Sequence, residues 1–516
     1  MNHLRVHASL AAELRAVTST VSSCGSATRM TSLRILNALK PMMALLAAVL
    51  LLQAAPSRSG KTEGVLAELK HLDHHEDSPL HKADATFAER LHNAVKRSNA
   101  RIAGFQNIIA RGVSPRGADF DPTSEEWSRG SSFESPVSSS PGSYFMTISL
   151  GSPPQTKTVI VDTGSDLVWL QCAPCTQCFQ QSNPVFDPKS SSSYKRIRFY
   201  SSWCSELPLR YYDGGFCTYR YGYGDGSTTE GDLATDTLTL TTTEGSKHAV
   251  PEFTFGCGDK NRGTFAGADG LVGLGRGALS FNEQIRPLIG SQFSYCLVEL
   301  SAPATSVLLL GGASTTVGNG LNVKFTPLMR NPVADTFYYV KLNGVKVNNQ
   351  VVGGIPAGAF TLKRSGSGGV ILDSGRTLTY LIRSAYDPIL LRLRSLIQYP
   401  VLDSSHLGLD LCYDLSGMSR PVFPSVTLEF QGVDLVLPAD NLFVRVDDRG
   451  TTCLALAGTT DLSIIGNIQQ QNHYFLYDVE NERVGIAAVG SCAKLASKSI
   501  THPAGKNDRE EFWEEL

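Results

Sequence analysis

Several classes of protein are disfavoured by what the sequence lacks. Only 18% of its 516 residues are charged and the formal net charge is −2, so the basic surface that nucleic-acid binding requires is missing. None of the three histidines between residues 139 and 496 lies beside a G-x-S-x-G sequence, which argues against a serine hydrolase. The glycine-rich stretch at 366–369 lacks the Lys-Ser/Thr pair of a phosphate-binding loop. What remains is a globular chain with 42% hydrophobic residues, enough for a sizeable core.

Cysteine is well represented: ten of the eleven cysteines lie between Cys172 and Cys492, and the other, Cys24, lies near the N-terminus. A C-x2-C-x2-C cluster opens this set at 172–178. Such a cluster could hold a metal, but zinc sites usually offer four Cys or His ligands and no histidine lies near it. Disulfide bonds are the favoured interpretation, provided that the chain is secreted.

The N-terminal region has the order of features that is typical of a secretory signal peptide. Arg34 and Lys40 precede an apolar run at about 42–52, and small residues come after it at 54–57. The apolar run is short for a membrane span of about 20 residues. We therefore expect an N-terminal extension and signal peptide over residues 1–57, with a membrane anchor formed by the apolar run as the less favoured alternative.

Residues 58–138 differ in composition from the β-rich chain that comes after them. Phe87, Leu91 and Val95 recur four apart, which predicts an amphipathic helix. The stretch from Lys82 to Arg111 holds six Lys or Arg against two Asp or Glu, and a Ser/Pro/Gly-rich linker comes after it. A basic helical unit before a flexible linker indicates a removable pro-segment and linker; a solvated helix at the edge of the folded domain is the alternative.

From Tyr144 onward the sequence consists of short β-rich runs punctuated by Gly, Pro, Asn and Asp. Helical stretches are few, and residues 383–398 form the clearest one, so the expected class is all-β. The last stretch, 497–516, is expected to be an acidic disordered tail. Predicted strands include 144–151, 157–164, 233–243, 337–347 and 424–432.

One pattern occurs twice in the chain. VIVDTGSDLVWL begins at Val159, and VILDSGRTLTYL begins at Val370. Each is succeeded, about 90 to 110 residues later, by an apolar-apolar-Gly element, ADGLVGLG at 268–275 and LSIIGN at 462–467. A single D-T-G is weak evidence, but two copies, each with its own second element, indicate an internal duplication that contributes one carboxylate per half.

Paired carboxylates of this kind predict general acid–base chemistry. Two carboxylates held close together cannot both ionise cheaply, so they share one proton. The ionised member can take a proton from water while the protonated member polarises a substrate carbonyl. Gly164 and Gly375 allow the tight turns that present Asp162 and Asp373. We also expect the hydroxyls of Thr163 and Ser374 to brace the two loops against each other.

Over residues 140–495 the chain resembles the pepsin-type (A1) aspartic proteases, in particular the nepenthesin-like branch that is common in plants. The motifs that carry this resemblance include VDTGSDLVWLQC, YGYGDGSTTEGDLATDTLT, GLVGLGRGALS, ILDSG, LCYD and IIGNIQQQN. The resemblance implies a bilobed pepsin-like fold of two duplicated β-barrel lobes with the active-site cleft between them. The N-terminal lobe would span 139–315 and the C-terminal lobe 316–496, and a pro-segment would cover the cleft before maturation.

The resemblance also implies roles for individual residues. Asp162 and Asp373 match the catalytic pair, and Ser165 matches the hydroxyl that hydrogen-bonds the first carboxylate. Tyr223, with Gly224 after it, matches the tyrosine of the flap that closes over substrate, and Trp169 matches the tryptophan that packs against it. Without the family, ordinary core packing would be the better explanation for the two aromatic residues.

Arg376 departs from the family pattern. The position three residues after the second aspartate is usually Thr or Ser, whose hydroxyl binds the carboxylate. Here a cation lies within reach of Asp373, and a nearby opposite charge favours the ionised carboxylate. Because an unpaired buried guanidinium is costly, we expect Arg376 either to pair with an acid or to swing out to water, with Thr377 then supplying a hydroxyl.

The cysteines fit the same branch, whose members often carry twelve in the mature protein. The missing two would fall near Phe199 and between Pro208 and Gly215, and we expect them to be each other's partners. Cys412 and Cys453 match a disulfide of the C-terminal lobe. All ten are expected to be disulfide-bonded and purely structural: Cys172, Cys175, Cys178, Cys204, Cys217, Cys257, Cys296, Cys412, Cys453 and Cys492.

The sequence therefore predicts a secreted aspartic endopeptidase, made as a zymogen and directed to the apoplast or the vacuole. It would act as a monomer on protein or peptide substrates, with its own pro-segment as inhibitor and with no metal, cofactor or nucleic acid. The alternative is a pepsin-fold binding or inhibitor-like protein with weak or no activity. Both aspartates are present, which favours the enzyme, whereas Arg376 favours the alternative.

Overall fold

The computed structural model describes residues 65–71, 144–224, 226–241, 247–263, 265, 267–299, 302, 304–403 and 408–501. All of them belong to one compact unit, Lys61–Leu516. The predicted signal peptide over 1–57, the basic helix predicted near 82–111, Cys24 and the chain beyond Thr501 lie outside the described residues. The expected domain boundaries at 57, 138, 315 and 496 therefore stay predictions.

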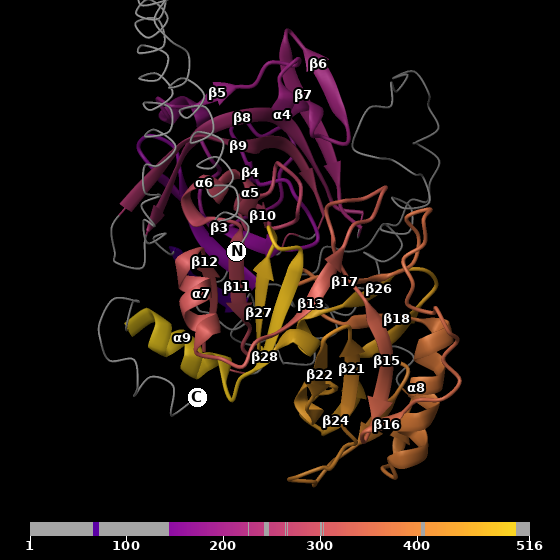
Figure 1. Ribbon diagram of the computed structural model, residues 1–516. Helices are drawn as coiled ribbons and strands as arrows, with labels where there is room; N and C mark the ends of the chain where they lie inside the picture. The colour runs from indigo at the N-terminus through magenta and orange to yellow at the C-terminus, as the bar shows by residue number, and fades with distance from the viewer. Residues whose placement is uncertain are drawn as a thin grey trace, which may run out of the picture. The chain divides into compact units, whose positions relative to one another are not determined.

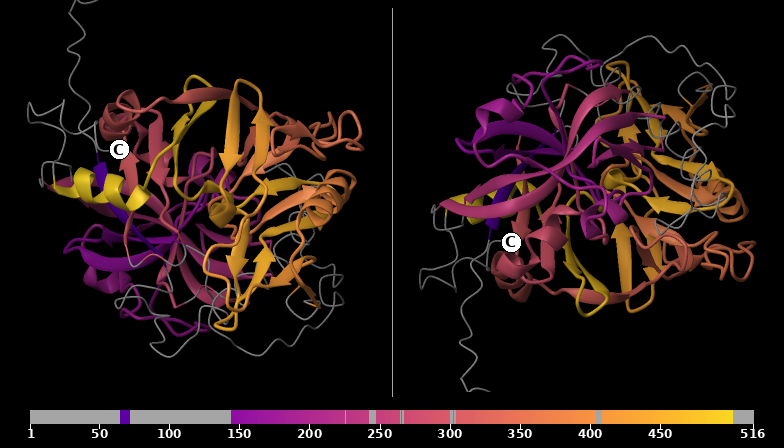
Figure 2. Two further views of the ribbon diagram at one scale, coloured as in Figure 1. Left: turned by 90° about the horizontal axis from the view of Figure 1, so that it is seen from below. Right: turned by 90° about the horizontal axis from the view of Figure 1, so that it is seen from above.

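The described chain is mostly β-structure arranged as two lobes, which confirms the predicted fold class (Figure 1). In both views of Figure 2 most of the N-terminal half, in indigo to magenta, lies opposite most of the C-terminal half, in orange to yellow, while the yellow C-terminal helix α9 (Cys492–Thr501) lies beside the N-terminal half. The five predicted strands are present as parts of β2, β3, β8, β14–β15 and β21, and the predicted helix is α8. No helix among the described residues is long and apolar enough to cross a membrane.

Strands of the N-terminal half succeed one another with few helices between them. A typical strand is β2, which pairs antiparallel with β3 and buries most of its side chains. The elements are β2 (Tyr144–Leu150), β3 (Gln155–Asp162), β4 (Trp169–Gln171), η3 (Pro188–Ser190), β5 (Lys195–Arg196), α4 (Ser202–Ser205), β6 (Arg210–Asp213), β7 (Phe216–Gly222), β8 (Thr228–Thr241), β9 (Lys247–Arg262), β10 (Gly270–Gly273), α5 (Phe281–Gln284), α6 (Arg286–Ile289), β11 (Gln292–Cys296), β12 (Ser306–Leu310) and α7 (Gly312–Asn319).

The C-terminal half repeats this texture. Helix α8 covers one side of it and buries Ala385, Tyr386, Ile389 and Leu393, which share one helical face. The elements are β13 (Lys324–Met329), β14 (Tyr338–Val340), β15 (Leu342–Val347), β16 (Gln350–Val351), β17 (Val370–Leu372), β18 (Thr379–Ile382), α8 (Arg383–Leu396), β19 (Val401–Leu402), β20 (Cys412–Asp414), β21 (Val426–Phe430), β22 (Val433–Leu437), η5 (Ala439–Asn441), β23 (Phe443–Arg445), β24 (Thr451–Leu454), β25 (Leu456–Thr459), β26 (Ser463–Ile465), η6 (Asn467–Gln470), β27 (His473–Asp478), β28 (Arg483–Ala488) and α9 (Cys492–Thr501).

The duplicated sequence elements fold into the same local arrangement in both halves. In the first half, β10 runs parallel to β3, with Gly273 opposite Asp162, and antiparallel to β4. In the second half, β26 runs parallel to β17, with Ile465 opposite Leu372, and antiparallel to β18. The apolar-apolar-Gly element of each half therefore lies beside the strand that leads to the aspartate. This pairing explains why both elements recur together in the sequence.

The two halves share a sheet. Strand β11 of the first half pairs with β27 of the second, and β27 pairs with β28, which in turn pairs with β13 (Figure 1). Large aromatic side chains fill this junction: the rings of Phe293 and Tyr477 stack at 4.5 Å, and Tyr338 packs on Tyr477 at 4.5 Å. The lobes are thus joined by a continuous hydrogen-bond ladder and a common aromatic core.

Strand β1 (Val65–His71) lies within the predicted pro-segment and was not predicted as a strand. It pairs antiparallel with β12 over five residue pairs and with the start of β2 over two. Its Leu69 is buried in the main hydrophobic core. A piece of the expected pro-segment is therefore hydrogen-bonded into the folded body of the protein.

All ten cysteines of the described chain form disulfide bonds, as expected. The C-x2-C-x2-C cluster divides, because Cys172 pairs with Cys257 in β9 while Cys175 pairs with Cys178. The remaining pairs are Cys204–Cys217, Cys296–Cys492 and the predicted Cys412–Cys453.

A ring contact lies near the two positions where the resemblance led us to expect additional cysteines. The rings of Phe199 and Tyr212 meet edge to face at 5.6 Å, and Arg210 lies over the ring of Phe199 at 5.8 Å. An aromatic contact thus joins the two segments that the absent disulfide was expected to join.

Candidate active site

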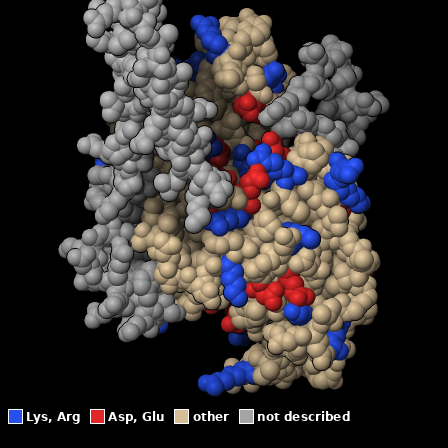
Figure 3. Space-filling view, viewed as in Figure 1, with Lys and Arg blue, Asp and Glu red and all other residues tan. Residues whose placement is uncertain are grey.

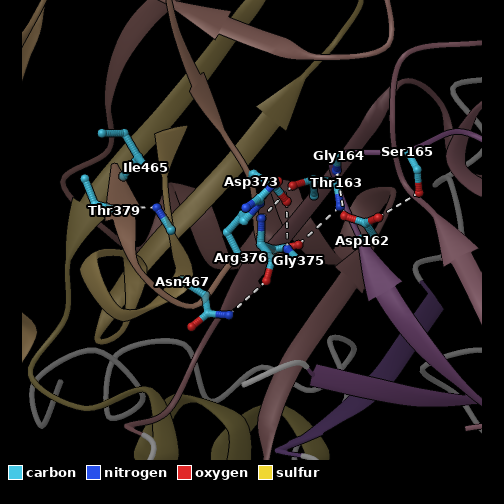
Figure 4. Close-up of polar contacts among 12 residues, drawn as sticks. Asp162, Thr163, Gly164, Ser165, Asp373, Gly375, Arg376, Thr379, Ile465 and Asn467 are labelled. Atoms are coloured by element: carbon cyan, nitrogen blue, oxygen red, sulfur yellow. Dashed lines mark hydrogen bonds and ion pairs between the residues drawn. The ribbon is translucent and has the colours of Figure 1, made fainter. Parts of the chain in front are cut away.

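The two aspartates come together at the ends of equivalent strands. Asp162 is the last residue of β3, and Asp373 comes directly after β17. Each backbone is held by its neighbouring strand, through Leu274 N–H to the Asp162 carbonyl at 2.8 Å and Asp373 N–H to the Ile465 carbonyl at 3.1 Å. Both side chains are fully buried. Figure 4 shows the two carboxylates near each other at the centre of the site.

Gly164 fits this site because it has no side chain. A Cβ atom at position 164 would lie 2.9 Å from the carboxylate atoms of Asp373, closer than real Cβ contacts allow. The first aspartate loop therefore packs directly on the second carboxylate. This close approach, rather than turn geometry alone, explains a glycine after Asp-Thr.

The two aspartate loops exchange hydrogen bonds. The N–H of Thr163 donates to Ser374 Oγ at 3.2 Å, and the N–H of Ser374 donates to Thr163 Oγ1 at 2.9 Å. Tyr477 adds a hydrogen bond to Thr163 from within the core, and its hydroxyl lies 2.8 Å from that of Tyr295. The loops are thus locked to each other and supported by the aromatic junction between the lobes.

Hydrogen bonding differs between the two carboxylates. Asp162 accepts from Gly164 N–H at 3.0 Å and from the Ser165 hydroxyl at 2.8 Å. Asp373 accepts from Gly375 N–H at 2.9 Å, but its Oδ2 faces Arg376 Nε at 3.5 Å (Figure 4). A hydroxyl therefore serves the first carboxylate and a guanidinium the second.

Arg376 is fully buried in this site. The sequence left two alternatives open for Arg376, pairing with an acid or pointing out to water. In the structure the side chain pairs with Asp373. The N–H of Asn467 donates to the Arg376 carbonyl at 2.5 Å, and the Asn467 amide donates to the Ser374 carbonyl at 3.0 Å. The buried cation favours the ionised form of Asp373, since opposite charges in a poorly solvated site attract strongly.

Tyr223 lies in the turn between β7 and β8, which we call the flap (Gly222–Thr228). The turn is closed by Tyr223 N–H donating to the Ser227 carbonyl at 2.8 Å. Trp169 Nε1 donates to the Tyr223 hydroxyl at 2.7 Å, so the two predicted aromatic residues are in contact. Burial and nearby groups raise the pKa of Tyr223 well above its ordinary value, so the hydroxyl stays protonated. The adjacent Gly224 is buried, and residue 225 lies outside the described chain.

Asp166 is a half-buried acid that sequence reasoning missed. Its Oδ1 accepts from Gly277 N–H at 2.8 Å, and its Oδ2 accepts from the Thr336 hydroxyl at 2.6 Å. Burial raises the pKa of this carboxyl to about 6, although the two hydrogen bonds act in the opposite direction. Thr336 lies just before β14, so this contact ties the first aspartate loop to the second half of the chain. An acid inside the first repeat, where the second repeat has Thr377, is the signal that could have revealed it.

Among the described residues, no group of three or more His, Cys, Asp or Glu side chains is arranged to hold a metal ion.

Comparisons with known proteins agree with this geometry. The N-terminal domain model of the xylanase inhibitor family matches residues 144–312, and the C-terminal one matches residues 337–488. The chain is 40% identical over 432 residues to "Aspartyl protease family protein 2" of Arabidopsis thaliana, which covers 82% of this chain and 85% of that one. It is 41% identical over 362 residues to "Aspartic proteinase nepenthesin-1" of Nepenthes gracilis, which covers 69% and 80%.

Solved structures share the fold at lower identity. The crystal structure of edgp has a TM-score of 0.56 at 21% identity and covers 68% of this chain and 94% of its own. The structure of Basic 7S globulin from soybean has a TM-score of 0.55 at 22% identity and covers 69% and 95%.

We predict that Asp166 makes the protein more stable in acid. Its folded pKa of about 6 lies above the ordinary 3.8, so the stabilisation by the bound proton is fully present below about pH 4 and is lost as the pH rises through about 6. In Asp166→Asn, the amide can accept from Gly277 N–H and donate to Thr336, as a protonated carboxyl would. Between pH 4 and pH 7 the wild type should lose about 2–3 kcal/mol of unfolding free energy relative to this variant.

Thermal unfolding of both proteins across this pH range tests the prediction, with the exposed Asp434→Asn as control. A constant difference in melting temperature between wild type and Asp166→Asn would contradict it.

Proposed function

Because the chain belongs to the pepsin-type aspartic protease family, in its nepenthesin-like branch, we propose that it is an aspartic endopeptidase. The observation that carries the proposal is the junction of two duplicated loops, interlocked through Thr163 and Ser374, that holds Asp162 and Asp373 together. The relatives at about 40% identity are named as aspartic proteases. We propose the same activity for this chain because it has both carboxylates.

The unequal surroundings of the carboxylates assign their roles. Asp373, beside Arg376, is the ionised member and takes a proton from the attacking water. Asp162 holds the shared proton and donates it in a hydrogen bond to the substrate carbonyl oxygen. The water oxygen bonds to the carbonyl carbon, whose oxygen takes the proton from Asp162. Asp373 then passes the proton that it took from water to the amide nitrogen as the C–N bond breaks, and a hydroxyl of the intermediate returns a proton to Asp162 as the carboxylic acid forms. Tyr223 and the flap cover the substrate meanwhile.

Arg376 sets the pH range of this reaction. The Arg376 guanidinium, 3.5 Å from Asp373 Oδ2, also favours ionisation of Asp162, the other carboxylate of the pair. A doubly ionised pair lacks the proton that polarises the carbonyl, so the active, singly protonated form is confined to lower pH. We therefore propose a weak enzyme that works in acid.

We further propose that the protein is secreted as a zymogen. Its support is the composition of residues 58–138, the signal-like sequence before them, and strand β1, which belongs to this segment and is paired with β12. On the face of the molecule in Figure 3, acidic and basic residues are interspersed. We propose that the basic segment pairs with local groups of carboxylates.

A second candidate function is that of a pepsin-fold binding protein with little or no activity. The observation that favours it is the fully buried guanidinium against one of the two aspartates. The descriptions of the matching domain models refer to a xylanase inhibitor. This candidate and the enzyme differ in a single measurable property, pepstatin-sensitive cleavage at low pH.

We expect Asp162→Asn to abolish cleavage of acid-denatured globin, since an amide keeps the shape of the carboxyl but cannot exchange the shared proton. The loss should be at least about a thousandfold, because removal of one member of a catalytic unit disables the whole. Asp434→Asn, an exposed acid far along the chain, is the matched control. Substantial residual cleavage by the Asp162 variant would refute the assignment of the pair.

Arg376→Thr should raise the catalytic rate and extend activity upward by about one to two pH units, because removal of an opposite charge raises the pKa of a carboxylate by this order. Arg376→Lys retains the charge and should keep the acid-restricted profile. The measurement is kcat/KM against pH on one peptide substrate. A wild type that already matches the Thr variant at every pH would show that the arginine has no influence.

The pro-segment should keep the enzyme latent at neutral pH and release it in acid, when the carboxylates that pair with its basic residues become protonated. The test compares the full precursor with a protein that begins at Ser139, across a range of pH. Equal activity of the two proteins at every pH would disprove latency.

A further inference from the structure

We propose that the disulfide-bonded loop Cys172–Gln181 positions the flap, and that Phe179 is the residue through which it acts. This inference rests on the proposed protease function, because the flap matters only to a protein that closes over a substrate. Neither Phe179 nor its aromatic neighbour Phe265 was singled out by the sequence. Two separate routes connect the loop to the flap.

The loop itself is rigidly held. Its first residue, Cys172, is bonded to Cys257 in β9, and the Cys175–Cys178 disulfide closes a small ring just before Phe179. The buried side-chain amide of Gln171 makes two hydrogen bonds to the backbone of Phe179. It donates to the Phe179 carbonyl at 3.0 Å and accepts from the Phe179 N–H at 3.2 Å. The position of the Phe179 ring is therefore determined by the loop.

The first route is a cluster of aromatic rings. Phe179 packs on Phe265 at 5.2 Å and, edge to face, on Trp169 at 6.4 Å. Phe265 packs edge to face on Trp169 at 4.8 Å and on Tyr223 at 5.6 Å. The residue that hydrogen-bonds Tyr223 and the residue that packs on its ring are thus both in contact with Phe179.

The second route runs through the backbone of β9. Thr176 N–H and Gln177 N–H both donate to the Asp259 carbonyl, at 2.8 and 3.0 Å, and Asn261 N–H donates to the Gln177 carbonyl at 2.6 Å. Asn261 is paired with Thr229, the second residue of β8, and its side chain accepts from the Thr229 hydroxyl at 2.7 Å. The strand that leaves the flap is therefore anchored to the same loop.

These contacts restrict how far Tyr223 can move. Removing the Phe179 ring would leave space beside Phe265 and Trp169, both of which could then shift away from Tyr223. The flap would open more often, and part of the binding free energy would go into closing it again. The effect should appear in substrate affinity rather than in the chemical step, because the contacts of Phe179 in the described chain are with the flap support and not with the carboxylates.

The experiment uses Phe179→Ala, with Phe179→Tyr as the conservative rescue and Tyr200→Ala as the control. Tyr200 is 89% exposed and lies outside the cluster, so it matches the loss of an aromatic ring without the loss of support. Hydrogen exchange of the flap peptide is measured in the unliganded protein, together with kcat and KM on a peptide substrate. We expect exchange about fivefold faster and KM raised severalfold in Phe179→Ala, with kcat changed less than twofold and the other two variants like the wild type.

Unchanged exchange and unchanged KM in Phe179→Ala would overturn the inference. If that variant does not fold, Phe179→Leu, which keeps most of the apolar volume, should show the same changes at smaller size, and its identity to the wild type would overturn the inference equally. A wild type without pepstatin-sensitive cleavage would refute the proposed function instead, and flap exchange would still decide whether the loop positions the flap.

Discussion

The exchange of hydrogen bonds between Thr163 and Ser374 is the constraint on which the rest of this structure depends. Two loops that are 211 residues apart must approach closely enough for each N–H to reach the hydroxyl of the other. This approach leaves no room for a Cβ atom at Gly164, and it requires the strands that carry the loops to end at the same level. The parallel pairings of β3 with β10 and of β17 with β26, together with the sheet shared by β11 and β27, meet that requirement.

Within this nearly symmetric frame, the chain has made the two carboxylates unequal. Ser165 offers Asp162 a neutral donor, whereas Arg376 offers Asp373 a full charge in a site shielded from water. Asp166 adds a second inequality, because the first half has a half-buried acid that accepts a hydrogen bond from Thr336. A duplicated scaffold thus places the two carboxylates in different electrostatic surroundings, which is the basis of the roles proposed for them.

Much of this architecture could be predicted from the sequence because its signals are local. The apolar strands that end in Asp-Thr/Ser-Gly, the second element of each half and helix α8 are each visible within a dozen residues. Other features depend on partners that are about 80 to 170 residues away in the sequence. Examples are the Cys172–Cys257 disulfide, the hydrogen bond between Asp166 and Thr336, and the contact of Phe179 with Phe265. Arg376 shows most clearly what the sequence could not predict. Its charge was evident, but the packing around it decides whether the side chain is buried in an ion pair or points out to water. Strand β1 was missed because its pairing partners lie elsewhere in the chain.

Strand β1 has a consequence for the proposed removal of the pro-segment. Strand β12 has β11 on one side and β1 on the other. Cleavage anywhere between His71 and Tyr144 would leave β1 attached only by non-covalent contacts, among them its hydrogen bonds and the packing of Ala67 and Leu69. Once it departs, a fully buried strand becomes an open sheet edge, which is a template for any passing β-strand and a starting point for aggregation. If the proposed pro-segment is removed, the same cut would therefore expose this sheet edge, and a high protein concentration at that point would favour aggregation.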